Sequence, residues 1–390
     1  MPLHAEGNAN LAADDPGNDA PGLGTTVLIR TPTSSAATED GRAHYLAVVA
    51  GERAGLRIEL GGKPVVIGRA PPADLVIDDS QISRKHCRIS LVLDEVYVAD
   101  LGSSNGTMVD GKRIASTAML PPGARLQIGG HVLEHEFRSR KEVEASKELD
   151  RDLESARRYV QSLIPAPLVE GPIRTEWVLL PSARLGGDVF GYHHLDARTF
   201  AIFLLDVSGH GTGAAMHAVS VTNILRRDAL PGVDMRDPAK VASYVNTLFQ
   251  MNTHGGLYLT LWYGVYDLET RTLQYCSAGH HPSYLVPAAR EGAIPLKTPN
   301  IMIGATSAFE FESASVEVPP GSRLYVFSDG IFEIEAKDGQ QWSLDHVVPV
   351  IVEPPIQGLT EPERLLRAIR GHARSPDFDD DFTVLVATFL

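Results

Sequence analysis

The sequence predicts a multidomain protein in which an all-β sandwich, a linker helix and an α+β domain follow one another. Three observations lead to this prediction. Short apolar runs separated by turn residues fill 41–139, a charged stretch with helical periodicity covers 140–166, and strand-like runs with grouped helical segments fill 167–390. The first 40 residues have too few large apolar side chains to form a core. A chain of 390 residues is long enough for two or three domains.

The charge balance excludes two broad classes of partner. Acidic residues outnumber basic ones by 49 to 35, which gives a net charge of −14 and argues against general binding to nucleic acid or anionic membranes. No apolar run approaches the length of a membrane span, and no basic region followed by an apolar one stands at the start. Cys87 and Cys276 are expected to be buried, reduced thiols. We therefore expect a cytoplasmic protein.

The tail, 1–40, is expected to be flexible. Thr25, Thr26, Thr31 and Thr33 flank the small apolar patch 27–29 and are candidate phosphorylation sites. The alternative is a plain solvated tail, which the composition favours.

The segment 41–139 predicts an antiparallel sandwich, because short strands follow one another at close spacing with almost no helical periodicity. Polar residues gather at three loop positions, 68–69, 83–86 and 102–107. Arginine chelates phosphate with two parallel hydrogen bonds, so basic and hydroxyl side chains on neighbouring loops would form a phosphate pocket.

The pattern GR, then SxxH, then NG resembles the forkhead-associated (FHA) domain. The resemblance implies recognition of phosphothreonine peptides, with Gly68 and His86 in structural roles. Arg69 and Ser83 would hold the phosphate, Arg84 would assist, and Asn105 would bond the peptide backbone. The complete set of expected phosphopeptide-binding residues is Arg69, Ser83, Arg84, Ser104 and Asn105. The ligand would be another protein or the chain's own tail.

The segment 140–166 predicts a helix with an apolar seam. The seam residues lie at alternating steps of four and three and are Leu149, Leu153, Ala156, Val160 and Leu163. Two heptads fit either a coiled coil that joins two copies of the chain or an amphipathic helix packed on its own domain. Pro165 and Pro167 end the helix.

The segment 167–390 predicts an α+β domain with packed sheets and helices outside. The predicted strands are 176–180, 200–207, 257–267, 272–276, 283–286, 323–328, 331–335 and 382–390. The predicted helices are 212–229, 238–251 and 361–373.

Acidic residues stand at turns beside these strands, in GGD, DVSGHG, SDG and FDDDFT. The positions are Asp188, Asp206, Asp329, and Asp380 with Asp381. A single Asp-Gly is usually a turn former or helix cap. Four such sites after apolar strands instead indicate oxygen ligands for a hard divalent cation.

The motifs GGD, DVSGHG, SAGHHP, SDG and DDFT, in this order, resemble the metal-dependent serine/threonine phosphatase (PPM) family, and within it the SpoIIE/RsbU-like bacterial branch. The resemblance implies a β-sandwich flanked by helices that binds two Mn²⁺ or Mg²⁺ ions. Asp206 would bridge both ions, and Asp188 with the Val207 carbonyl would serve one. Asp329 and Asp380 would serve the other, with Asp381 as the alternative to Asp380.

Three further residues are candidates for the chemistry. His210 and His280 would protonate the leaving serine or threonine oxygen, or would only shape their loops. Arg184 would contact the substrate phosphate. The branch often has an acid where this chain has Gly191, so any supporting role of that acid is absent here.

The leading hypothesis is a protein serine/threonine phosphatase regulated by its FHA domain. The branch resemblance implies a phosphorylated bacterial regulator as substrate, such as a STAS-type anti-sigma-factor antagonist. One alternative is a phosphothreonine-dependent scaffold with a weak or inactive phosphatase domain, for which Gly191 is the support. A serine hydrolase using Ser208 is disfavoured because no GxSxG elbow occurs.

Overall fold

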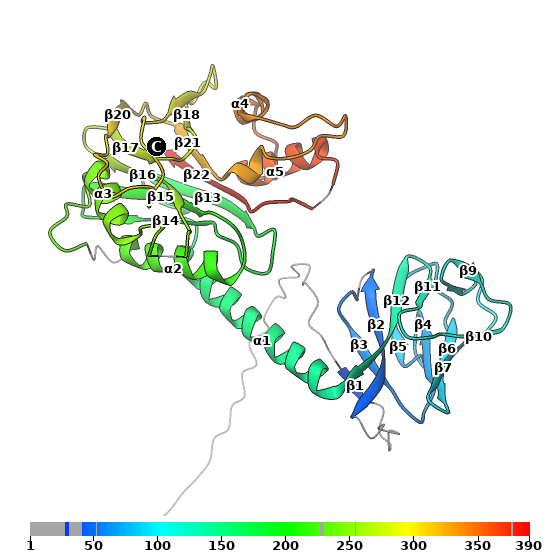
Figure 1. Ribbon diagram of the computed structural model, residues 1–390. Helices are drawn as coiled ribbons and strands as arrows, with labels where there is room; N and C mark the ends of the chain where they lie inside the picture. Colours follow the sequence, from blue (N-terminus) through cyan, green and yellow to red (C-terminus); the bar gives the residue numbers. More distant parts are fainter. Residues whose placement is uncertain (1–27, 31–40, 52, 227–229, 254, 376) are drawn as a thin grey trace, which may run out of the picture. The chain divides into compact units, whose positions relative to one another are not determined.

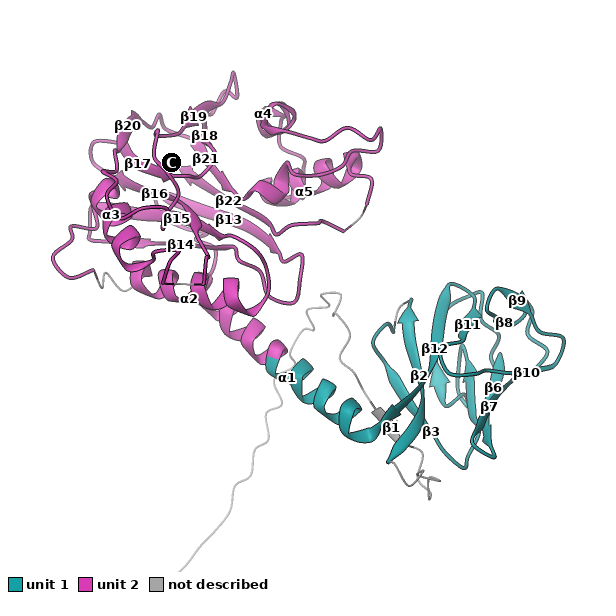
Figure 2. Ribbon diagram, viewed as in Figure 1, with its two compact units in different colours: residues 1–152 teal, residues 153–390 magenta. Residues whose placement is uncertain are grey.

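The computed structural model describes residues 28–30, 41–51, 53–226, 230–253, 255–375 and 377–390 (Figure 1). The chain divides into two compact units, Met1–Asp152 and Leu153–Leu390 (Figure 2). The candidate phosphorylation sites of the tail lie outside the described residues; these are Thr25, Thr26, Thr31 and Thr33.

The first unit is the predicted all-β sandwich. One sheet has the strand order β1 (Leu28–Arg30), β3 (Arg57–Leu60), β2 (Arg42–Ala50), β12 (His131–Ser139), β11 (Arg125–Ile128), β8 (Met108–Val109) and β9 (Lys112–Arg113). The other has the order β10 (Thr117–Met119), β7 (Glu95–Asp100), β6 (Cys87–Val92), β4 (Val65–Gly68) and β5 (Leu75–Val76). Alternation buries Cys87 and Ile89 while Arg88 between them is exposed, as expected for a strand with one face on the core.

Helix α1 (Arg140–Leu163) occupies the predicted linker. Val160 packs against a core cluster of the second unit, and Leu163 is 8% exposed. These seam residues therefore follow the alternative in which the helix packs on its own domain. Leu149, earlier on the seam, is 59% exposed.

The second unit contains two five-stranded sheets. One has the order β13 (Ile173–Leu180), β22 (Phe382–Phe389), β21 (Ser322–Phe327), β18 (Ser283–Val286) and β19 (Ile294–Leu296). The other has the order β14 (Val189–His194), β15 (Thr199–Val207), β16 (Leu259–Asp267), β17 (Thr272–Ala278) and β20 (Ala314–Glu317).

Three buried clusters define four layers in this unit. The cluster between the sheets includes Phe190, Ile202 and Leu385. The outer face of the β14–β20 sheet packs on α2 (Thr212–Arg226) and α3 (Pro238–Leu248), and the outer face of the β13–β19 sheet packs on α4 (Leu344–Val352) and α5 (Glu361–His372). This arrangement is the predicted pair of packed sheets with helices outside.

The structure corrects one predicted strand and contains elements that were not predicted, namely helix α4 and strands β14, β19 and β20. The predicted strand 331–335 is wrong, because a 3-10 turn, η1 (Asp329–Ile331), follows β21, and Glu335 forms only an isolated bridge with Gln341. Helix α4 was not predicted, because Pro349 and a run of valines mask its helical pattern. Its serine N-cap, Ser343, is part of a capping box with His346.

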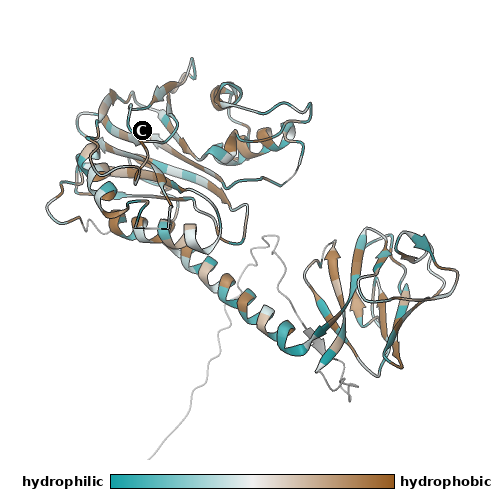
Figure 3. Ribbon diagram, viewed as in Figure 1, coloured by the Kyte–Doolittle hydropathy of each residue, from teal (hydrophilic) through white to brown (hydrophobic). Residues whose placement is uncertain are grey.

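Hydropathy follows the layers. Figure 3 shows apolar residues concentrated in the strands of both sandwiches, whereas the beginning of α1 is largely hydrophilic.

Cys87 and Cys276 are buried free thiols, as predicted. No helix among the described residues is long and apolar enough to cross a membrane.

Candidate functional site

Two of the predicted acids lie side by side on one sheet. Asp188 directly precedes β14, and Asp206 is the penultimate residue of β15. Val189 pairs with Leu205, so continuing the antiparallel register places Asp188 opposite Asp206. Alternation along the strands directs both side chains toward the other sheet.

The other acids come from the facing sheet. Asp329 opens the turn η1 directly after β21, and Asp380 and Asp381 directly precede β22. Because β21 and β22 are antiparallel neighbours, the end of one strand lies beside the start of the other. Gly330 makes this approach close, since a Cβ atom there would lie 2.3 Å from the Asp381 carbonyl oxygen.

The pKa values report the convergence of these carboxylates. Burial and the charges of Asp206 and Asp381 raise the pKa of Asp188 well above its ordinary range. Burial, with repulsion from Asp329, Asp380 and Asp381, raises the pKa of Asp206 to about 7. The acids of both sheets therefore share one electrostatic environment.

Glu333 is a further acid of this site that sequence reasoning missed. Burial and the charges of Asp380 and Glu333 raise the pKa of Asp329 to about 6. Glu333 lies four residues after Asp329, and its amide donates to the Asp329 carbonyl oxygen at 2.8 Å. The acid spacing in DGIFE was the available signal.

The donor set fits hard divalent cations. Carboxylates that raise each other's pKa repel one another because no positive charge lies between them. A bound cation would remove this repulsion. No three acidic, histidine or cysteine side chains in the described parts of the chain are close enough to enclose a metal ion as they stand. Cations that retain several water ligands do not require such an enclosure.

Neighbouring hydroxyls orient Asp188. Thr383 Oγ1 donates a hydrogen bond to Asp188 Oδ2 at 2.6 Å, and both residues are buried. Ser328 interacts with the Asp188 side chain in the direction that lowers the pKa of this acid, and the Ser328 Oγ accepts from Thr383 N at 3.1 Å. Sequence reasoning did not single out these two hydroxyls.

The turn after β15 carries two more predicted residues. The Val207 carbonyl oxygen faces Gly187, where a Cβ atom would lie 2.6 Å from it. Gly209 and Gly211 have positive φ, which explains the glycine pattern of DVSGHG. His210, between them, is exposed.

His280 has a different environment. It is 2% exposed, burial lowers its pKa to about 4, and its Nδ1 donates to the His281 carbonyl oxygen at 2.9 Å. A buried neutral imidazole suits the predicted alternative, in which this histidine shapes its loop.

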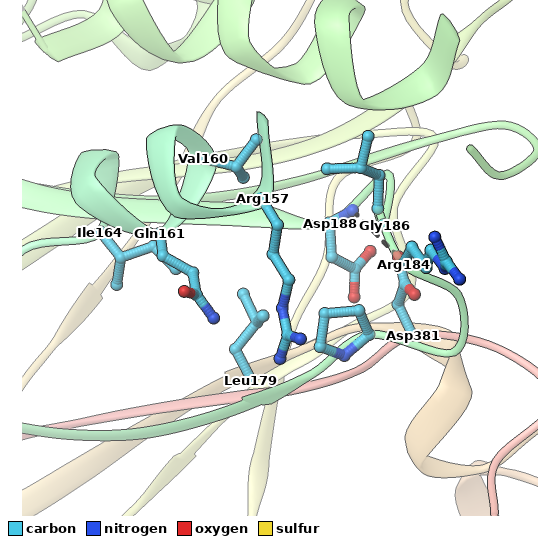
Figure 4. Close-up of a pocket in the computed structure, with 11 residues that line it drawn as sticks. Arg157, Val160, Gln161, Ile164, Leu179, Arg184, Gly186, Asp188 and Asp381 are labelled. Atoms are coloured by element: carbon cyan, nitrogen blue, oxygen red, sulfur yellow. Dashed lines mark hydrogen bonds between the residues drawn. The ribbon is translucent and has the colours of Figure 1, made fainter. Parts of the chain in front are cut away.

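A pocket in the second unit reaches Asp188 and Asp381 (Figure 4). The predicted substrate contact Arg184 contributes to its wall, as do Arg157 and Val160 from α1. Arg184 is exposed and belongs to the same loop as Asp188.

The structure explains Gly191. A Cβ atom at this position would lie 2.4 Å from Phe203 Cζ. Gly191 shares the face of β14 with Val189, which packs toward α2 and α3 rather than toward the facing sheet. An acid here would point away from Asp188, so Gly191 does not weaken the acidic site.

In the first unit, the predicted polar residues come together at neighbouring loops. Arg69 N donates to the Ser83 carbonyl oxygen at 3.0 Å, and Ser104 N donates to Ser83 Oγ at 3.0 Å. Asn105 Nδ2 donates to the Gln81 carbonyl oxygen at 2.8 Å. The second basic residue of the predicted set, Arg84, directly follows Ser83 and is exposed.

Two buried residues support these loops as expected. His86 is fully buried, with Nδ1 accepting from Ser83 N at 3.2 Å and Nε2 donating to the Gly106 carbonyl oxygen at 3.1 Å. A Cβ atom on Gly68 would lie 2.0 Å from the Arg84 carbonyl oxygen, so only glycine fits there.

Asp100 is a support that sequence reasoning missed. Its carboxylate accepts hydrogen bonds from the backbone amides of Gly102 and Ser103 and from the hydroxyls of Ser103 and Thr107. Burial acts to raise its pKa, but the hydrogen bonds from Ser103 and Thr107 outweigh it and lower the pKa to about 2. Asp100 therefore shapes the loop that carries Ser104 and Asn105.

Comparison with known proteins assigns both units. Residues 65–129 match the FHA domain, and residues 196–390 match the family described as stage II sporulation protein E (SpoIIE). The chain is 27% identical over 188 residues to phosphoserine phosphatase RsbP of Bacillus subtilis, which covers 47% of this chain and 45% of RsbP. It is 45% identical over 92 residues to the FHA domain-containing protein FhaB of Mycolicibacterium smegmatis, which covers 24% of this chain and 59% of FhaB.

The chain thus spans about half the length of these curated relatives. Among solved structures, the SiaA-PP2C domain of Pseudomonas aeruginosa matches with a TM-score of 0.54 at 20% identity, covering 63% of this chain and 99% of that domain. This likeness confirms the predicted phosphatase-type fold. Since the SpoIIE model matches half of the chain, C-terminal to an FHA domain, the chain belongs to the SpoIIE family.

Proposed function

We propose that this chain is a metal-dependent protein serine/threonine phosphatase whose FHA domain binds phosphothreonine. The observation that carries the first half is the convergence of Asp188 and Asp206 from one sheet with Asp329 and Asp380 from the other. Membership of the SpoIIE family supports the same reaction.

The proposed ligands form two groups, one for each ion, and Asp206 belongs to both. Asp188 and the Val207 carbonyl would hold one Mn²⁺ or Mg²⁺ ion, Asp329 and Asp380 would hold the other, and Asp206 would serve both. When bound, two such ions lower the pKa of a water molecule and neutralise charge on the phosphoryl group. The protein's own contribution is to fix the carboxylates in a partly buried site between the sheets.

Two exposed residues flank this site. Arg184, in the loop before Asp188, would hold the substrate phosphate by its guanidinium group. His210, in the exposed turn after Asp206, would supply the proton to the leaving oxygen, since histidine is the side chain that most often serves as a general acid or base. The buried His280 would support its loop.

Hydrolysis of phosphoserine and phosphothreonine peptides tests the reaction. We expect turnover with Mn²⁺ or Mg²⁺, loss of turnover with chelator, and loss with Asp206→Asn. The matched control is Asp338→Asn, which changes an exposed acid on the same unit. Turnover that survives both chelator and Asp206→Asn would contradict the proposal.

Membership of the family supports a proposal for the substrate class. RsbP is named a phosphoserine phosphatase, and we propose a phosphorylated bacterial regulator, such as a STAS-type anti-sigma-factor antagonist, as the substrate of this chain. A phosphorylated STAS protein that is not hydrolysed faster than its short phosphopeptide would count against this assignment.

The FHA half is proposed to bind phosphothreonine through Arg69, Ser83 and Ser104, with Arg84 assisting and Asn105 holding the peptide backbone. Fluorescence anisotropy with a phosphothreonine peptide library and its unphosphorylated counterpart tests this. We expect Arg69→Ala to lose binding and Arg88→Ala, on the exposed face of β6, to keep it. Equal binding by Arg69→Ala would contradict the site.

Helix α1 is proposed to join two copies of the chain through its exposed seam residue Leu149. Light scattering should report a dimer, and Leu149→Glu should shift it toward monomer. A monomeric wild-type chain would refute this.

A further inference from the structure

We propose that Asp381 is a positioning residue that folds the loop carrying Asp188, which leaves Asp380, the ligand already proposed above, as the member of this pair that is free to face an ion. The inference rests on the proposed function for the role of Asp188 and goes beyond it in assigning Asp381. The relevant segment is 182–188, which leads into β14.

The Asp381 carboxylate is occupied by this loop. Oδ1 accepts from Ser182 N at 2.8 Å and from Ser182 Oγ at 3.0 Å. Oδ2 accepts from Gly187 N at 2.8 Å and from Asp188 N at 3.4 Å. An ionised carboxylate has about four acceptor positions, so these four donors account for them.

Burial strengthens the assignment. Asp381 is only 5% exposed, and two of its donors are the amides of the buried residues Gly187 and Asp188, which would otherwise lose their hydrogen bonds inside the protein. Figure 4 shows Asp381 beside Gly186 and Asp188 at one end of the pocket. The Asp381 carboxylate thus accepts hydrogen bonds from both ends of the segment 182–188 and holds this loop in its folded conformation.

Gly186 shows how closely the loop wraps this carboxylate. A Cβ atom on Gly186 would lie 2.2 Å from Asp381 Oδ2, and its three nearest atoms all belong to the same carboxylate. Gly186 is not among the glycines with positive φ. The requirement for glycine therefore comes from Asp381 and not from the backbone conformation.

The backbone of Asp381 also anchors the second acidic loop. Ser328 Oγ donates to the Asp381 carbonyl oxygen at 2.9 Å, and Gly330 allows the turn of Asp329 to approach the same oxygen. One residue thereby ties together the segments that carry Asp188 and Asp329.

Asp380 has the opposite character. Its side chain is exposed, and its Oδ1 accepts a hydrogen bond from the adjacent Asp381 amide at 2.7 Å. Its charge raises the pKa of both Asp206 and Asp329. An accessible carboxylate that faces both of these acids is available to a cation, whereas that of Asp381 is not.

Thermal unfolding of the metal-free full chain separates the two roles. Asp381→Ala also removes a charge that repels Asp188 and Asp206, but it leaves four donors without their acceptor, and we expect this larger loss to lower its midpoint. Asp380→Ala removes a repulsive charge next to Asp206 and Asp329, so its midpoint should stay or rise. Should Asp381→Ala not fold, Asp381→Asn gives the same sign, because its amide keeps one acceptor oxygen and loses the other.

Calorimetric titration with Mn²⁺ is the second readout. Asp381→Ala should weaken Mn²⁺ binding by about 10- to 100-fold, the range for residues that orient metal ligands. A double-mutant cycle then identifies the contact. Gly186→Ala should lower the unfolding midpoint in the wild-type background and much less in the Asp381→Ala background, where the obstructing carboxylate is gone.

Gly187→Ala is the matched control. Its added methyl group would meet the Val207 carbonyl oxygen, which Asp381→Ala leaves in place, so its steric cost should persist in both backgrounds. The inference is overturned if Asp381→Ala leaves or raises the metal-free midpoint, or if Gly186→Ala costs as much without the Asp381 carboxylate as with it.

The failure of the proposed function would look different. Wild-type Mn²⁺ affinity in Asp206→Asn would refute the metal site itself. The unfolding cycle of Gly186 and Asp381, measured without metal, would still support or overturn the loop contact.

Discussion

Substitution of Thr383 by valine tests how the protein holds its first metal-binding acid. Thr383 Oγ1 donates to Asp188 Oδ2 at 2.6 Å, Thr383 is fully buried, and Asp188 is 4% exposed. Valine has nearly the same shape as threonine, so the change removes the hydroxyl and leaves the packing of β22 in place. A buried oxygen of Asp188 then lacks one donor.

The expected magnitude follows from the charge of the acceptor. A hydrogen bond to a charged group contributes about 1.5–3 kcal/mol. Since about 1.4 kcal/mol corresponds to a tenfold change in an equilibrium constant, Thr383→Val should weaken Mn²⁺ binding by about 10- to 150-fold. The hydrogen bond orients Asp188 for binding the ion and does not contact the substrate. Turnover at saturating Mn²⁺ should therefore change less than the affinity for Mn²⁺.

The assay is the Mn²⁺ concentration that gives half-maximal hydrolysis of a phosphoserine peptide, checked by calorimetric titration of Mn²⁺. Thr388→Val, on the same strand and partly exposed, is the matched control and should behave as wild type. A half-maximal concentration within about twofold of wild type for Thr383→Val would refute the orienting role.

Two further predictions concern stability. Glu361→Gln removes the charge that faces the buried side chains of Arg290 and Arg364, and should lower the free energy of unfolding by about 3–5 kcal/mol in urea titrations; a loss below about 1 kcal/mol would contradict it. Asp100→Asn should lower the unfolding midpoint of the first unit and weaken phosphothreonine binding. Because the folded-state pKa of Asp100 is lowered to about 2, the stability it contributes is present above its unfolded pKa and is lost as pH falls through about 2. The difference between wild type and Asp100→Asn should therefore shrink between about pH 5 and pH 2, and a constant difference would contradict this.

The sequence predicted those parts of the site that lie on one continuous pattern. An apolar strand followed by an acid and glycines correctly placed Asp206 at the end of β15. The same reasoning found Asp188 and Asp329 at strand ends. Strand alternation and turn chemistry are local properties, so they can be read without knowledge of the fold.

The contacts that organise the site could not be found in this way. Thr383 and Asp188 are 195 positions apart, and Ser182 and Asp381 are 199 apart. Only the pairing of β22 with its neighbours brings them together. Likewise, the local sequence does not show that the roles of Asp380 and Asp381 differ. They differ in their surroundings, because the side chain of Asp381 bonds the distant segment 182–188 and that of Asp380 is exposed.

Local patterns also misled where two signals compete. The apolar residues of 331–335 suggested a strand, but the preceding Asp-Gly turn continues as η1 and Ile331 packs into the cluster beneath α4 and α5. In α4, tertiary burial of Val347 and Ile351 overrides the weak helix propensity of valine and the internal proline.

The number of Mn²⁺ ions bound by the purified chain, measured by calorimetric titration after removal of metal, tests the central claim most directly. We predict two ions per chain for wild type and a loss of binding at both positions for Asp206→Asn, because the charge of Asp206 interacts with Asp188 on its own sheet and with Asp329 on the facing sheet. A wild-type chain that binds no Mn²⁺, or an Asp206→Asn chain that binds two ions as tightly as wild type, would contradict it.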